Sequence, residues 1–343
     1  IWVVRHDLTT SDRVTEVVMR AHEAGLNALF VQVRGRGDAY YSSDFVPPGE
    51  GIEPDFDPLQ ACLDLAGKAG IEVHAWVNVY LTWYPNRRPQ HAHVLEKHPD
   101  WFMISNDGVD MGQPDLKVDL VERGVEGRYL SPAHPSVSGH LLRVIEEIVV
   151  RYPVAGIHLD YARYPNEHYD FSPMAQSGFW SDVQRDPPDP AESGVLRVSW
   201  NRWRSEQVTR FIREAKQLVH RLRRGTQLSA AVKPDLHLAY QRYGQDWVHW
   251  VNRRYLDFVV PMFYTGSTQS IQSKMRIVRK YVQKGRVYAG LGAWNQEAED
   301  TFEQIDVSQR TRLNGFSLFS YSTLAASPGL RQGLKRRFGR EDP

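Results

Sequence analysis

The sequence contains a single cysteine, Cys62, among its 343 residues. One cysteine cannot form an internal disulfide framework or a cysteine-based metal cage. Cys62 falls on the apolar face of an expected helix, so we interpret it as a small buried hydrophobic residue rather than a nucleophile. This scarcity excludes disulfide-stabilised scaffolds and zinc-binding modules built from cysteines.

Long apolar runs and a strong charge bias are also missing. No stretch approaches the roughly 20 apolar residues that a membrane span requires. The formal net charge is +1, which gives no electrostatic reason to expect nucleic acid or an acidic membrane surface as a partner. No glycine-rich phosphate-binding loop stands out, and we expect no cofactor. The sequence leaves the oligomeric state open.

What the sequence does contain is a regular alternation of strand and helix patterns. Each expected strand is followed by helical material, which predicts a single (β/α)8 barrel over residues 1–343. The expected strands lie at residues 1–5, 27–34, 71–80, 154–160, 227–233, 256–264, 286–294 and 315–321.

The spare length of the chain is concentrated in three connections. The segments after strands two, three and four are long, at residues 36–56, 81–135 and 161–199. Neither of the last two has a periodic core pattern of its own, so we expect cleft walls rather than an inserted domain. Barrel active sites are built from the loops at the C-terminal ends of the strands, and we expect the functional cleft there.

The inward faces of several strands are polar or aromatic, whereas barrel interiors are usually packed with Val, Ile and Leu. Buried polar groups cost stability unless they are paired, so such a face more often marks a site than a core. The sequence is also rich in aromatic residues, with 10 Trp and 16 Tyr that can stack on sugar rings. The inward candidates are Gln32, Arg34, His74, Trp76, Asn78, His158, Asp160, Tyr264 and Trp294.

Linked sequence blocks spread over nearly the whole chain resemble the signature of glycosyl-hydrolase-like family 10, also called DUF187. The blocks are residues 31–43, 56–59, 73–78, 129–132, 156–161, 163–165, 257–264 and 315–321. The resemblance implies a TIM barrel, frequent export, and hydrolysis of bacterial polysaccharides, with a glycosidase of denuded peptidoglycan among the members. One departure is Tyr161, where the family often has a second acidic residue.

Asp160, at the C-terminal end of strand four, is the expected general acid/base of a glycoside hydrolase. Burial beside Trp76 or Tyr161 would raise its pKa, and a nearby arginine would lower it. Asp38, after strand two, is expected as the second carboxylate or as an orienting group. The alternative for both aspartates is simple ion pairing with neighbouring arginines.

Other polar and aromatic residues are expected to line the sugar subsites. Two of them, Tyr264 and Trp294, occupy positions where chitinase-like barrels hold an acetamido group that assists the reaction, an exception to the two-carboxylate scheme. His74 and His158 are expected to support the carboxylate by hydrogen bonding. The full set of predicted substrate-binding residues is Arg34, His74, Trp76, Asn78, Tyr80, His158, Tyr161, Arg163, Tyr264 and Trp294.

The resulting prediction is a glycoside hydrolase that cleaves a bacterial polysaccharide containing amino sugars, either of the peptidoglycan type or an exopolysaccharide. The alternatives are a carbohydrate-binding barrel without catalysis and a metal-dependent hydrolase using His74, His158, Asp160 and Asp38. Against a metal, strand one lacks the HxH pair common in such enzymes, and we expect no metal site. The sequence does not begin with methionine; we expect an exported protein whose N-terminal signal is absent from it.

Overall fold

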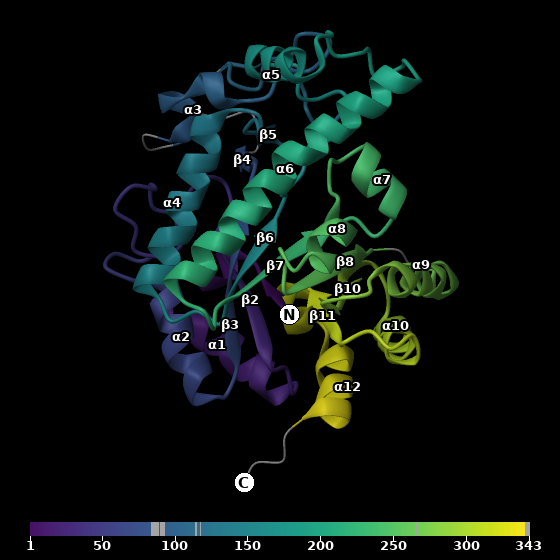
Figure 1. The fold of residues 1–343 in the computed structure, drawn as a ribbon. Helices are drawn as coiled ribbons and strands as arrows, with labels where there is room; N and C mark the ends of the chain where they lie inside the picture. Colours follow the sequence, from purple (N-terminus) through teal and green to yellow (C-terminus); the bar gives the residue numbers. More distant parts are fainter. Residues whose placement is uncertain (84–88, 90–92, 114, 117, 265–266, 340–343) are drawn as a thin grey trace.

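Eight parallel strands form a nearly closed barrel in the computed structural model, which describes residues 1–339 except 84–88, 90–92, 114, 117 and 265–266 (Figure 1). In hydrogen-bonded order the strands are β1 (Trp2–Val3), β2 (Ala28–Arg34), β3 (Glu72–Asn78), β6 (Gly156–Asp160), β7 (Gln227–Val232), β8 (Phe258–Phe263), β10 (Ala289–Gly292) and β11 (Phe316–Phe319). The barrel closes by side-chain packing, because the rings of Trp2 and Phe319 lie 6.1 Å apart between the first and last strands. The predicted TIM barrel is confirmed.

Helices cover the outside of the barrel (Figure 1). Their N-termini carry the expected capping residues; for example, Thr10 and Asp57 accept hydrogen bonds from backbone N–H groups in the first turns of α1 and α2. The helices around the barrel are α1 (Ser11–Glu23), α2 (Pro58–Lys68), α4 (Pro135–Arg151), α6 (Val195–Leu222), α7 (Leu236–Gln241), α8 (Trp247–Asn252), α9 (Thr268–Tyr281), α10 (Ala298–Arg310), α11 (Tyr321–Ala326) and α12 (Pro328–Phe338), with short 3-10 turns η1 (Arg5–Leu8) and η3 (Ala293–Asn295). Across the described ranges, no helix combines the length and apolarity needed to cross a bilayer.

Alternate residues of each strand serve two different cores. Outward residues such as Val31 and Ala75 belong to the large apolar core beneath the helices. Inward residues such as Phe30 and Trp76 form a separate small cluster inside the barrel. This division follows from the period of two along a strand, and it places the polar inward residues in the barrel interior.

The long connections rise above the C-terminal ends of the strands. The segment after β3 contains the antiparallel pair β4 (Leu81–Trp83) and β5 (Arg128–Tyr129), with α3 (Val94–Lys97) and η2 (Pro99–Trp101) between them. The segment after β6 contains α5 (Pro173–Val183), and it ends earlier than expected because α6 begins at Val195. This extension of α6 packs Trp200 against Phe179 of α5 in a small apolar cluster of its own. This part of the segment after β6 is therefore held by an apolar cluster separate from the barrel core.

Several predicted strands end sooner than expected, and two of these differences affect the aromatic residues Tyr264 and Trp294. The seventh is split into β9 (Arg286–Val287), which pairs with β8, and β10, after which the chain turns into η3. Trp294 thus lies on a 3-10 turn above the barrel, where a Cβ at Gly292 would come within 2.6 Å of its ring. Strand β8 ends at Phe263, so Tyr264 also projects from the rim.

Candidate functional site

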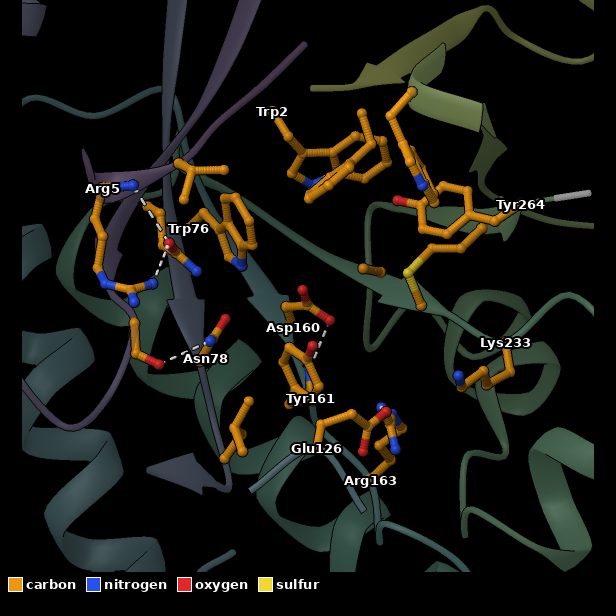
Figure 2. Close-up of a pocket in the computed structure, with 18 of the residues that line it drawn as sticks. Trp2, Arg5, Trp76, Asn78, Glu126, Asp160, Tyr161, Arg163, Lys233 and Tyr264 are labelled. Carbon is orange, nitrogen blue, oxygen red and sulfur yellow. Dashed lines mark hydrogen bonds and ion pairs between the residues drawn. The ribbon is translucent and has the colours of Figure 1, made fainter. Parts of the chain in front are cut away.

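A cavity of about 730 Å³ opens at the C-terminal ends of the barrel strands. Its walls come from all eight strands or the turns that follow them, and from the long segment after β3. Figure 2 shows Asp160 near the centre of this site, with Trp76 and Asn78 on one side and Tyr264 and Lys233 on the other. The polar and aromatic lining includes Trp2, Arg5, Gln32, Arg36, Trp76, Asn78, Glu126, Asp160, Tyr161, Arg163, Lys233, Tyr264, Lys274, Trp294 and Phe319.

Asp160 is the last residue of β6, and only 8% of it is exposed. Its Oδ1 accepts a hydrogen bond of 2.7 Å from the backbone N–H of Tyr161. Burial raises the pKa of Asp160 to about 6, although that hydrogen bond and the positive charges of Arg163 and Lys233 oppose the rise. A carboxyl group with such a pKa can hold a proton at mildly acidic pH and deliver it to a substrate.

Glu126, from the long segment after β3, is a second carboxylate in the cavity wall. Its Oε1 lies 2.6 Å from Nη2 of Arg163, and its Oε2 accepts a hydrogen bond of 2.9 Å from the hydroxyl of Tyr129. Burial alone would raise the pKa of Glu126, but the charge and hydrogen bond of Arg163 outweigh burial and lower it. The negative charge of Glu126 in turn contributes to the raised pKa of Asp160. The two carboxyl groups therefore differ in protonation.

Lys233 follows directly after β7 and faces the same cavity (Figure 2). Burial and the positive charge of Arg163 lower the pKa of Lys233 to about 8. Its ammonium group lies 5.0 Å from the ring centroid of Tyr243. Within the described part of the chain, no carboxylate pairs with this ammonium at ion-pair distance. Lys233 can therefore offer its hydrogen bonds to a ligand.

Aromatic side chains form another part of the wall. The rings of Tyr264 and Trp294 meet edge to face at 4.7 Å, and Trp294 remains 48% exposed. Burial, with the charge of Asp160 adding to it, raises the pKa of Tyr264 well above its ordinary value, so its hydroxyl stays protonated. An apolar surface with a protonated hydroxyl at its edge suits a sugar ring, which has apolar faces and polar edges.

On β3, two polar atoms of the wall are buried without a hydrogen-bond partner in the described structure. They are Nε1 of Trp76 and Oδ1 of Asn78. The amide nitrogen of Asn78 donates to the carbonyl of Gly35 at 2.8 Å, which fixes the orientation of the side chain. Buried donors and acceptors are rarely left unpaired in folded proteins. A ligand hydroxyl or amide could satisfy both atoms.

Three predicted site residues, two near the end of β2 and one after β3, lie outside this lining. The pairing of β2 with β3 shifts between Gln32 and Arg34, so Arg34 stands opposite Val77, whose side chain faces outward. Its guanidinium donates to the backbone carbonyls of residues 78 and 79 and supports the strand end. Asp38 accepts hydrogen bonds at Oδ1 from the backbone N–H groups of residues 35 and 36, at 3.3 and 2.7 Å, and thereby closes its own turn. Tyr80 is fully buried against Phe211.

The two histidines lie deeper in the barrel than the cavity. His158 Nε2 accepts a hydrogen bond of 3.1 Å from Nε1 of Trp2, Nδ1 lies 2.9 Å from the hydroxyl of Ser229, and the ring stacks on Phe30. His74 lines a smaller cavity of about 440 Å³ at the opposite end of the barrel. No group of three or more His, Cys, Asp or Glu suited to a metal ion occurs among the described residues. We predicted that these histidines support Asp160, but their hydrogen bonds go to other residues.

The structure therefore gathers Trp76, Asn78, Asp160, Tyr161, Arg163, Tyr264 and Trp294 from the predicted set. Two functional candidates escaped the sequence analysis. Lys233 could have been noticed, because it ends a strand just as Asp160 does. Glu126 carries no such signal, because it lies within a long irregular segment. It reaches the cavity because the pairing of β4 with β5 brings this segment back to the barrel.

The fold and the cavity together define a class: a TIM barrel with two carboxyl groups and several aromatic rings in a cavity at the C-terminal ends of its strands, as in glycoside hydrolases. Residues 1–298 match the family described as "Glycosyl hydrolase-like 10". The chain belongs to this family, which confirms the resemblance drawn from the sequence blocks.

The named relatives include two glycosyl hydrolases and an S-layer-related protein. "Glycosyl hydrolase DigH" of Escherichia coli K12 is 25% identical over 272 residues, covering 70% of this chain and 55% of DigH. "Glycosyl hydrolase YngK" of Bacillus subtilis is 22% identical over 292 residues, covering 77% of this chain and 51% of YngK. An "S-layer-related protein" of Niallia circulans is 26% identical over 267 residues, 70% of this chain but 16% of that protein. The matched region thus spans about half of DigH and YngK.

Solved structures share the architecture. The glycoside hydrolase domain of PgaB (BpsB) from Bordetella bronchiseptica superposes with a TM-score of 0.74 at 16% identity, covering 100% of this chain and 99% of that one. The catalytic domain of β-amylase from Paenibacillus polymyxa gives 0.65 at 9% identity, covering 97% and 96%. At these identities, the similarity establishes the fold.

Proposed function

We propose that this protein is a glycoside hydrolase that cleaves a bacterial polysaccharide containing amino sugars, with Asp160 as its general acid. The observation that carries the proposal is the divergence of two carboxyl groups in one cavity. The pKa of Asp160 rises to about 6, mainly by burial, while Arg163 holds the pKa of Glu126 below its ordinary value. Pairs of acids whose environments separate their pKa values are typical of glycosidase active sites.

In the proposed reaction, protonated Asp160 donates its proton to the oxygen of the glycosidic bond as that bond breaks. The sugar then develops positive charge at its anomeric carbon. Ionised Glu126 stabilises this charge, and the carboxylate of Asp160 then serves as the base that activates water. Arg163 acts as a positioning residue, because its hydrogen bond of 2.6 Å keeps Glu126 ionised and in place.

The proposed substrate class rests on family membership and on the wall that faces Asp160. The hydroxyl of Tyr264 and the carboxyl of Asp160 face the same open space (Figure 2). A protonated hydroxyl at this place can donate a hydrogen bond to the acetamido group of an amino sugar. Such polysaccharides lie outside the bacterial cytoplasm, so we also propose that the protein is exported.

The test is release of reducing ends from a panel of bacterial glycans, including peptidoglycan with and without its stem peptides. Wild-type protein and Asp160→Asn are assayed in parallel, because the substitution keeps the side-chain shape but removes the proton. We expect the rate on the cleaved glycan to fall by a factor of about 10²–10⁴. Equal rates in the two folded proteins would refute Asp160 as the acid.

The same panel separates the alternatives. Tight binding of a glycan without any release of reducing ends would favour a carbohydrate-binding barrel. Activity that disappears after dialysis against a chelator and returns with added metal would favour a metal-dependent hydrolase. Activity that survives the chelator and depends on Asp160 supports the proposal.

A further inference from the structure

A second cavity, of about 720 Å³, adjoins the candidate active site. The two cavities share Pro234 and Lys274 in their walls. We call the second one the distal groove and define it by Pro234, Tyr240, Asp246, Lys274, Ile277 and Tyr281. It lies among α7, α8 and α9, which neighbour one another on one side of the barrel (Figure 1). A molecule that leaves the active site past Lys274 enters this groove.

Helix α9 contributes a continuous stripe to the distal groove. Lys274, Ile277 and Tyr281 are spaced by three and four residues, which places them on one face of the helix. The stripe extends about 10 Å along the helix axis at 1.5 Å per residue, starting from the residue shared with the active site. Ile277 is 49% exposed and Tyr281 is 51% exposed. Two large apolar side chains therefore face solvent directly beside the proposed catalytic cavity.

The opposite wall combines an aromatic ring with polar groups. Tyr240 comes from α7, and burial, with the charge of Asp246 adding to it, raises its pKa, so its hydroxyl remains a hydrogen-bond donor. The side chain of Asp246 caps α8. Aromatic and aliphatic surfaces with a polar rim match the apolar faces and hydroxylated edges of sugar rings.

We infer that the distal groove binds the sugar units of the same polysaccharide that lie beyond those in the catalytic cavity. The inference rests on the proposed function and deepens it, since an extended binding track implies a preference for long chains. Continuity with the cavity through Lys274 argues for this occupant over an unrelated partner, because a polymer held at Asp160 must leave the site along some surface.

The test measures binding of peptidoglycan glycan strands freed of stem peptides and fractionated by length. Asp160→Asn serves as the background, so that strands are bound without being cut. We expect long strands to bind about three- to tenfold more weakly when Tyr281→Ala is added, the effect of losing one aromatic contact. The shortest strands, which fill only the catalytic cavity, should bind equally well with and without that change.

Trp180→Ala provides the matched control. Trp180 lies on α5, is exposed to the same extent as Tyr281 at 51%, and contributes to neither cavity. It should leave binding at every length unchanged. Ile277→Ala is a second variant in the groove and should weaken long strands only, in the same direction as Tyr281→Ala.

The outcomes separate this inference from the proposed function. Cleavage by the wild-type protein with binding independent of both length and Tyr281 would overturn the groove and leave the hydrolase standing. Length-dependent binding that requires Tyr281, together with no cleavage by the wild-type protein, would support glycan binding in the groove and count against catalysis. Failure to bind strands of any length overturns the inference. A change in oligomeric state in Tyr281→Ala, measured by light scattering, would identify the stripe as an interface and also overturn it.

Discussion

On the inner face of the barrel, His158 below the cavity (the lower layer) and the residues that line the cavity (the upper layer) differ in how completely their hydrogen bonds are satisfied. In the lower layer, both ring nitrogens of His158 have partners, and the ring stacks on Phe30 at 4.0 Å. In the upper layer, Trp76 and Asn78 each keep one buried polar atom without a partner in the described structure. His158 and Asp160 are separated by only two residues, roughly 6.6 Å along the strand. The polar groups of His158 are therefore satisfied within the protein, whereas those of Trp76 and Asn78 are left open to a ligand.

Burial also acts on both layers with opposite effects on pKa. It lowers the pKa of His158 well below its ordinary value and raises the pKa of Asp160 to about 6. Both shifts have one cause, because burial disfavours the charged form of each group. The result for His158 is a neutral ring that makes hydrogen bonds with Trp2 and Ser229. The result for Asp160 is a proton retained in a cavity that a substrate can enter.

After Asp160→Asn, the largest expected effect concerns Glu126, the second carboxylate of the upper layer. Glu126→Gln should lower kcat/KM by a factor of about 10²–10³, because the group that stabilises the developing positive charge becomes neutral. Asp38→Asn is the matched control, since it keeps the oxygen that accepts from residues 35 and 36. A larger loss from Asp38→Asn than from Glu126→Gln would instead favour Asp38 as the second carboxylate, which stays a prediction. Steady-state kinetics on the cleaved glycan decides between them.

A substitution in the lower layer should lower the stability of the protein rather than its activity. His158→Ala removes the partners of Trp2 and Ser229 and leaves a cavity under Phe30, and we expect a loss of about 2–4 kcal/mol in the free energy of unfolding. Activity per folded molecule should stay within about twofold of wild type, because His158 does not line the catalytic cavity. Denaturant unfolding and kcat are measured on the same samples. A drop in kcat without a loss of stability would contradict the structural role assigned to His158.

Removing the acidic group of Asp160 from the upper layer should make the folded protein more stable. The folded-state pKa of Asp160 lies above its ordinary value of 3.8, so ionisation destabilises the folded protein as the pH rises from about 4 to above 6. Asp160→Asn should therefore raise the free energy of unfolding by up to about 3 kcal/mol at pH 8, and the gain should shrink towards zero at pH 4. Unfolding curves of both proteins across this range test the sign. A gain that is constant with pH would contradict the assigned titration.

The smallest expected effect is a shift in the pH profile. The kcat/KM of the wild type should fall above pH about 6 as Asp160 ionises, and fall again at acidic pH as Glu126 gains a proton. The charge of Lys233 lowers the pKa of Asp160, so Lys233→Met should move the upper limb to higher pH by a fraction of a unit. Lys274→Met serves as the control, because it leaves Lys233 in place. A limb that moves to lower pH would contradict the proposed acid.

Predictions about the fold held where they depended on local patterns. The eight strands and the helices after them follow from the periodicity of apolar residues over short windows. The ends of elements were less accurate, as with Trp294, because the turn into η3 depends on packing above the barrel. Asp160 and Arg163, predicted at and just after the end of one strand, line the cavity because parallel strands bring their C-terminal ends together. Glu126 was missed because its position depends on the pairing of β5 with β4, two strands that are far apart in the chain.

The sequence by itself determined the barrel and the presentation of Asp160 at the end of β6, since both arise from the alternation of residues within single strands. Tertiary structure decided which inward residues reach the cavity. A shift in strand pairing turns Arg34 away from it, and depth in the barrel separates His158 from Asp160. Tertiary structure also decided the charges, because the pKa values of Asp160 and Glu126 depend on burial and on neighbours far away in the chain.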